Sequence, residues 1–114
     1  VAQKENVPLI ELNGMTTMLC DVLGVDGSMK LYVHYPAGTF PGQTREFKDN
    51  SHFSTYGAYE TAKCVVEGMK KAKLDIANYL RADYKGFNPA QPDKFKTFKW
   101  NLCPFTEIEK PDGN

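Results

Sequence analysis

The stretch that decides the fold of this chain is residues 49–64, which run Asp49-Asn50-Ser51-His52-Phe53-Ser54-Thr55-Tyr56-Gly57-Ala58-Tyr59-Glu60-Thr61-Ala62-Lys63-Cys64. An aspartate lies three residues before a histidine, among residues typical of loops, and an amphipathic helix follows. This spacing can hold a carboxylate against one imidazole nitrogen and leave the other nitrogen free to act as a base. We therefore expect Asp49 and His52 to form a site in a loop that leads into a helix.

The run D-x-x-H-x-x-x-x-G-A, from Asp49 to Ala58, resembles the last sequence block of the SGNH (GDSL-type) serine hydrolases. The surrounding residues are most similar to rhamnogalacturonan acetylesterase-like members. The resemblance implies an α/β fold, the C-terminal portion of a three-layer αβα sandwich with a flavodoxin-like parallel sheet. It also implies that His52 deprotonates a serine nucleophile and later protonates the leaving alcohol, that Asp49 orients His52, and that Gly57 lets the helix pack closely on the sheet.

The other sequence blocks of this family do not occur in the 114 residues. There is no Gly-Asp-Ser: residues 26–28 have the order Asp-Gly-Ser, and residues 49–50 reverse the family's Asn-Asp pair. We therefore expect the chain to resemble only the C-terminal part of such a domain, with the N-terminal strands missing, and to be inactive alone. Residues 2–6 resemble the last turn of a helix with Asn6 as its stop, which favours the same interpretation.

Composition argues against several other classes of function. Fourteen Lys and Arg balance 14 Asp and Glu, so net charge gives no sign of a nucleic-acid partner or of an anionic membrane surface. No apolar run reaches the length of a membrane span, about 20 residues. The three cysteines, Cys20, Cys64 and Cys103, lack zinc spacing, and we interpret the first two as buried free thiols. No metal or other cofactor is expected.

The first part of the chain predicts a strand, a helix and a long connection. Residues 7–12 form an apolar run with a proline near its start, which favours a strand. Asn13 is a suitable N-cap for the next helix, and Gly24 is a suitable end. The expected apolar face of this helix consists of Met15, Met18, Leu19, Val22 and Leu23. Residues 25–48 then form a long connection that includes a short strand at 31–35. A connection of this length is often a rim or lid over a site.

The second part predicts a long helix, a short helix and a tail. Ser54 or Thr55 can cap the long helix. Its expected apolar stripe consists of Ala58, Ala62, Val65, Val66, Met69 and Ala72, and its expected water-facing side of Glu60, Lys63, Glu67, Lys70 and Lys71. A short helix is expected around residues 75–80. We divide the chain into residues 1–84, the C-terminal part of the hydrolase domain, and residues 85–114, a tail that wraps the domain.

Each candidate site residue has a second interpretation. Asp49 and His52 could serve only as turn and capping residues before the helix, or, with Glu46, as metal ligands. His34 and Tyr35 are candidates for substrate binding by sugar stacking and hydroxyl recognition, and the other interpretation is a half-buried rim. The aromatic residues of the tail could stack on carbohydrate or simply anchor the tail; they are Phe95, Phe98, Trp100 and Phe105.

The resemblance implies a serine esterase that removes acyl groups, acetyl above all, from a polysaccharide such as pectic rhamnogalacturonan. The alternatives are another GDSL-type lipase or acylhydrolase, and a non-catalytic fragment that acts only by association. The expected partners are the acylated polysaccharide or another ester substrate, and either the N-terminal half of the same domain or a second copy of the chain. Nucleic acid and membrane are not expected partners. The family further implies a secreted or periplasmic protein.

Overall fold

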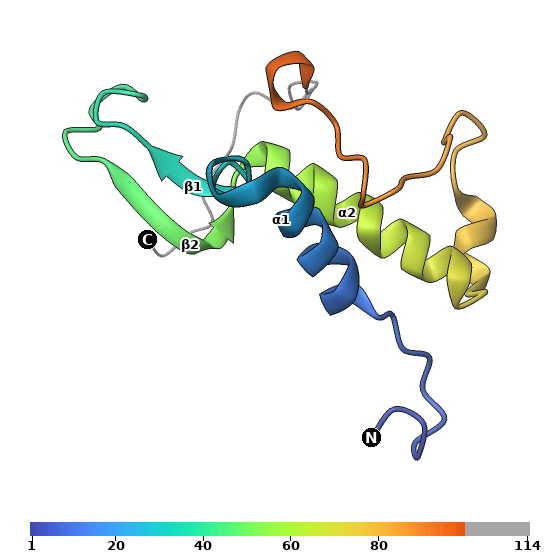
Figure 1. Cartoon of the computed structure of the whole chain (residues 1–114). Coiled ribbons are helices and arrows are strands. Elements are labelled where there is room, and N and C mark those ends of the chain that lie inside the picture. The colour runs from blue at the N-terminus through green and yellow to red at the C-terminus, as the bar shows by residue number, and fades with distance from the viewer. Residues whose placement is uncertain (100–114) are drawn as a thin grey trace, which may run out of the picture.

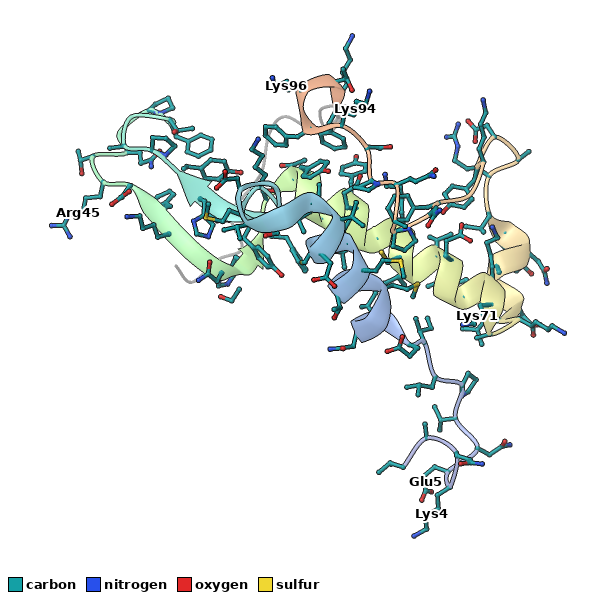
Figure 2. The ribbon with its side chains drawn as sticks, in the orientation of Figure 1. Lys4, Glu5, Arg45, Lys71, Lys94 and Lys96 are labelled. Atoms are coloured by element: carbon teal, nitrogen blue, oxygen red, sulfur yellow. The ribbon has the colours of Figure 1, made fainter. Side chains whose placement is uncertain are left out.

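The structure is a computed structural model that describes residues 1–99. Its elements in chain order are α1 (Leu12–Met29), β1 (Tyr32–Tyr35), β2 (Phe47–Phe53), α2 (Thr55–Lys71) and two short 3₁₀ helices, η1 (Asp75–Tyr79) and η2 (Phe95–Thr97). They form a small α/β arrangement in which two helices cross and a two-stranded hairpin lies at one end (Figure 1). Figure 2 places Arg45 at the tip of this hairpin and Lys71 at the opposite end of the molecule.

The single sheet within residues 1–99 is antiparallel, so a three-layer sandwich with a parallel sheet is not seen in this part of the chain. None of the helices described is both long enough and apolar enough to cross a membrane. The expectations for Trp100, Cys103 and Phe105 lie outside the described residues.

The strand expected at residues 7–12 does not form, and that prediction is wrong. Residues 7–11 have no regular structure, Leu9 keeps 70% of its surface exposed, and α1 begins at Leu12. The physical reason is the lack of a neighbour: Pro8 cannot donate a ladder hydrogen bond, and no described strand pairs with this segment. Apolar composition alone does not make a strand.

The turn before this segment agrees with its prediction. Asn6 has a φ of 51°, in the left-handed region that ends helices. The Val7 N–H donates to the Ala2 carbonyl at 3.0 Å, and the Glu5 N–H donates to the Val1 carbonyl at 3.0 Å. Residues 1–7 therefore contain one helical turn that stops at Asn6.

Both ends of α1 differ from their predictions. Glu11 caps the helix in place of Asn13, because its carboxylate accepts the Gly14 N–H at 2.9 and 3.2 Å. Gly24, the expected end, has φ 67° and ψ −176° and kinks the helix, which resumes and runs to Met29. A glycine in a stop conformation can therefore interrupt a helix without ending it.

The buried face of α1 is narrower than predicted. Leu19 is fully buried, and Leu12, Met15 and Leu23 pack partly buried against the same core. Met18 and Val22, expected on that face, are about half exposed. Two more apolar residues of α1 are exposed beyond the kink at Gly24, and we call the four exposed residues the α1 apolar set: Met18, Val22, Val25 and Met29.

The hairpin confirms the short strand expected at residues 31–35, as β1, and adds β2, which was not predicted. The two strands are antiparallel, and the paired residues are Tyr32 with Phe53, His34 with Lys48, and Tyr35 with Phe47. Residues 49–52 thereby face only Val33, so β2 carries a bulge there. Asp49 and His52 lie at the two ends of this bulge, within a strand and not in the expected loop.

The start of α2 is fastened to the backbone between α1 and β1. Ser54 caps the helix as expected: its oxygen accepts the Gly57 N–H at 3.1 Å, and its hydroxyl donates to the Lys30 carbonyl at 2.6 Å. The Ser54 N–H donates to the Leu31 carbonyl at 2.9 Å. A Cβ at position 57 would overlap the carbonyl group of Leu31. This agrees with the close packing expected of Gly57, against the residue that precedes β1.

The buried face of α2 differs from the predicted stripe. The residues that α2 turns inward are Tyr56, Gly57, Glu60, Cys64 and Gly68, with Leu19 and Leu31 completing the core. Ala58 and Ala62 are exposed. Glu60, expected to face water, is fully buried. Its burial is compensated because the Lys63 ammonium lies 2.6 Å from Oε1, as an ion pair without hydrogen-bond alignment, and the Asp93 N–H donates to Oε2 at 3.3 Å.

The chain after η1 returns along α2 toward the hairpin (Figure 1). Glu67 holds it near its start, accepting the Tyr84 hydroxyl at 2.9 Å and the Phe87 N–H at 3.0 Å. Farther along, the Tyr56 hydroxyl donates to the Asp93 carbonyl at 2.7 Å. The described part of the tail therefore packs on α2, while the boundary placed after residue 84 stays a prediction.

Replacing Gly57 with alanine tests the close approach of α2 to Leu31. The added methyl group would meet backbone, which cannot rotate away, so we expect Gly57→Ala to lower the free energy of unfolding by about 1–3 kcal/mol or more. Gly68→Ala is the matched control: its methyl group would meet the side chains of Ile10 and Met15, which can shift where a backbone carbonyl cannot. Both changes gain similar helix propensity, about 1 kcal/mol. Equal stability of the two variants in urea denaturation would contradict the close approach of Gly57 to the Leu31 carbonyl.

Candidate functional site

The Asp49 carboxylate and the His52 imidazole are in contact, with Oδ2 2.7 Å from Nδ1. The other carboxylate oxygen, Oδ1, accepts three hydrogen bonds from the bulge: from the Ser51 N–H at 2.7 Å, the Ser51 hydroxyl at 2.7 Å and the His52 N–H at 2.9 Å. The His52 side chain is 80% exposed and that of Asp49 is 35% exposed. One carboxylate oxygen therefore organises the bulge, and the other holds the imidazole.

These hydrogen bonds keep Asp49 ionised. The His52 N–H, then the N–H and hydroxyl of Ser51, and then the His52 side chain hold the pKa of the Asp49 carboxyl well below its usual range. An ionised carboxylate against Nδ1 favours a proton on that nitrogen, so that Nε2 of the neutral imidazole carries a lone pair. No hydrogen bond to Nε2 forms within residues 1–99. Nε2 is thus available to a proton donor that approaches from solvent.

No serine of the chain is held against Nε2. Ser51 donates its hydroxyl to Asp49, and its oxygen lies 3.4 Å from Nδ1, on the carboxylate side of the ring. The Ser54 hydroxyl is engaged in the α2 cap, and Ser28 donates to the Val25 carbonyl at 3.0 Å. The pair has the geometry of an oriented base, and none of the three serines lies against its free nitrogen.

His34 and Tyr35, the two other candidates, lie side by side on β1. His34 is tied to the bulge, since its Nε2 is 2.7 Å from Oδ1 of Asn50. Tyr35 packs edge-on against Phe40, with ring centroids 5.0 Å apart. Both line a cavity of about 560 Å³ between β1, the start of α2 and the tail. The structure therefore connects His34 to the Asp49–His52 bulge, and the substrate-binding role of His34 and Tyr35 stays a prediction.

The remaining titratable candidates have other partners. Glu46, considered above as a metal ligand, pairs with Lys48 at 2.9 Å. Within residues 1–99 no group of three His, Cys, Asp or Glu side chains is placed to hold a metal ion. Cys20 and Cys64 carry free thiols, and burial, followed by the charge of Glu60, raises the pKa of the Cys64 thiol.

Sequence reasoning missed several residues around this cavity. Asn50 had a local signal, because it lies inside the bulge beside Asp49. Lys30 and Tyr56 had no such signal. Each contacts the tail residue Phe95, which lies 65 residues after Lys30 and 39 residues after Tyr56. Contacts of that length arise only from the tertiary fold.

The chain is similar to the rhamnogalacturonan acetylesterase RhgT of Bacillus subtilis (strain 168), with 34% identity over 80 residues. The match covers 70% of this chain and 34% of the relative, so the chain spans about a third of the relative's length. No protein-family profile matches the chain, and no solved structure matches it. The match supports the esterase relationship that residues 49–58 indicated.

The depressed pKa of Asp49 can be measured by carbon-detected NMR of its carboxyl group. We expect its titration midpoint in the folded chain to lie below the ordinary aspartate value of about 3.9. In urea the same carboxyl should return to the ordinary value. Because the folded pKa is the lower one, ionised Asp49 favours the folded state above the ordinary pKa, and this contribution is lost as pH falls through the folded value. Equal midpoints in the folded and denatured chain would contradict the hydrogen bonding described here.

Proposed function

We propose that Asp49 and His52 are the acid–base pair of a serine esterase. The observation that carries the proposal is the 2.7 Å contact between Asp49 Oδ2 and His52 Nδ1, which leaves Nε2 without a partner in the described part of the chain. The similarity to an acetylesterase supports ester hydrolysis as the reaction. The relative's name further suggests acetyl groups on a polysaccharide such as rhamnogalacturonan as the substrate.

In the proposed reaction, His52 Nε2 accepts the proton of a serine hydroxyl while the serine oxygen attacks the ester carbonyl. The imidazolium then gives this proton to the leaving sugar oxygen as the bond between carbonyl carbon and that oxygen breaks. Water repeats the sequence on the acyl-serine and releases the acid and the free serine. Asp49 stays ionised throughout, orients the ring and stabilises its positive charge.

The serine must come from polypeptide that these 114 residues do not supply, since each serine of the chain is engaged elsewhere. We infer that this polypeptide corresponds to the part of the relative that the chain does not span. The α1 apolar set supports the inference: its most exposed member, Val25, is 79% accessible, and several exposed apolar residues on one helix are typical of a helix covered by further protein. The same set favours the second candidate function, a non-catalytic segment that acts by association.

A chimera distinguishes the two candidates. In the Bacillus esterase, the segment that this chain matches is replaced by the corresponding residues of this chain. We expect the chimera to hydrolyse aryl acetates, and His52→Ala in it to lower kcat on the order of 10³-fold or more, because the nucleophile loses its base. We expect Asp49→Asn in the chimera to lower kcat by a comparable or smaller factor.

Lys48→Ala is the matched control, because Lys48 is an exposed residue of the same strand. The isolated chain is the baseline, and we expect neither hydrolysis above background nor labelling by an organophosphonate. Near-normal turnover of the His52→Ala chimera would contradict the proposal. A chimera that melts cooperatively and yet has no activity would favour the associative role.

A further inference from the structure

The bulge that carries the proposed catalytic pair is held at both ends by the ladder of the hairpin. Lys48 pairs with His34 on one side, Phe53 pairs with Tyr32 on the other, and residues 49–52 between them face a single residue of β1. The Tyr32 ring also stacks on Phe53, with centroids 5.5 Å apart. Because the residues of a bulge leave the regular ladder, the middle of this one needs a contact of its own to have a fixed position on β1.

The hydrogen bonds of Asp49 do not supply that contact. Its Oδ1 accepts from the N–H and hydroxyl of Ser51 and from the His52 N–H, and its Oδ2 meets His52 Nδ1. All of these partners belong to the bulge itself. The bonds therefore fix Asp49 relative to His52, but they do not fix the pair relative to the rest of the hairpin.

One side-chain hydrogen bond joins the bulge to another element in the described part of the chain. His34 Nε2 lies 2.7 Å from Oδ1 of Asn50, which stands between Asp49 and His52. An amide oxygen can only accept, so Nε2 of His34 carries the proton. The His34 backbone is fixed by its pairing with β2, and an imidazole side chain has only two torsions. His34 is therefore a short support that runs from β1 to the middle of the bulge.

We propose that His34 is a positioning residue of the esterase, which acts through Asn50 to hold the Asp49–His52 pair where His52 Nε2 meets the serine hydroxyl. Proton transfer requires these two atoms within about 2.6–3.2 Å, and a displacement of about 1 Å can lower the rate on the order of 100-fold. The inference rests on the proposed function. It differs from the substrate contact that the sequence suggested for His34, because it assigns His34 to proton transfer and not to binding.

The support is tested first on the chain of 114 residues, which needs no nucleophile for this experiment. Nitrogen-15 relaxation gives the order parameters of the backbone N–H groups in residues 49–52. We expect His34→Ala and Asn50→Ala each to lower them from the rigid range, about 0.85, toward the flexible range, below about 0.6. The His52 tautomer and the low pKa of the Asp49 carboxyl should stay unchanged, because they depend on bonds inside the bulge.

Two further variants separate the hydrogen bond from the volume of the ring. A glutamine side chain carries its amide N–H as many bonds from the backbone as Nε2 of histidine, and an asparagine side chain is one bond shorter. We therefore expect His34→Gln to restore the order of the bulge and His34→Asn to leave it low. Lys48→Ala is the matched control, since the Lys48 ammonium pairs with Glu46, outside the bulge. Thermal melts show whether each variant is folded.

The same variants in the chimera separate positioning from substrate binding. We expect His34→Ala and Asn50→Ala each to lower kcat about 10- to 100-fold with KM unchanged, and His34→Gln to recover most of the loss. The double variant should lose no more than either single variant, because both substitutions remove the same bond.

Unchanged order of residues 49–52 in folded His34→Ala would overturn the proposal. A raised KM with unchanged kcat would overturn it as well, since that result is expected of a substrate contact, and so would additive losses from His34→Ala and Asn50→Ala. A chimera that is inactive without any substitution would contradict the proposed function, while the order parameters of the chain would still decide whether His34 holds the bulge.

Discussion

The approach of Gly57 to the Leu31 carbonyl is the contact on which the rest of the structure depends. There is no space for a side chain at position 57, and the neighbouring Ser54 uses both its N–H and its hydroxyl to bind the carbonyls of Leu31 and Lys30. These contacts join the end of α1, the start of β1 and the start of α2 at one point. Because β2 ends at Phe53, the same junction sets where the hairpin closes and where the bulge lies.

The bulge is organised by its own hydrogen bonds and needs little help from the core. A surface ion pair alone contributes too little to hold two exposed side chains in one geometry. Asp49 adds three hydrogen bonds to Oδ1, two of them from backbone N–H groups, and so fixes the carboxylate before the imidazole meets it. The pair can therefore form from residues of this chain alone. The long-range part of the site is the cavity, where the tail meets β1 and α2.

Local signals in the sequence were reliable where local chemistry decides the structure. The Ser54 cap and the stop at Asn6 follow from neighbours within a few residues. Asp49 meets His52 for the same reason, although in a bulged strand and not in a loop. The close packing of Gly57 and the short strand β1 were expected too, although their contacts, with Leu31 and with β2, are long-range. The catalytic roles of the pair, and the substrate roles of His34 and Tyr35, are predictions that the geometry permits.

The predictions that failed depended on distant partners. The apolar run at residues 7–12 has no strand beside it within residues 1–99, and β2 has a polar sequence that pairs only because β1 is present. Glu60 was expected to face water because it is charged. It is buried because Lys63 forms an ion pair with its carboxylate and the Asp93 N–H donates a hydrogen bond to it. The kink at Gly24 and the cavity wall formed by the tail likewise required the three-dimensional structure.

The protonation of the His52 ring tests the central claim most directly. Nitrogen-15 NMR of the folded chain, at a pH where His52 is neutral, distinguishes a protonated ring nitrogen from one that carries a lone pair. The account predicts the proton on Nδ1, shared with Asp49, and the lone pair on Nε2, with this preference lost in Asp49→Asn. A proton on Nε2, or a tautomer mixture that Asp49→Asn leaves unchanged, would contradict the assignment of His52 as an oriented base.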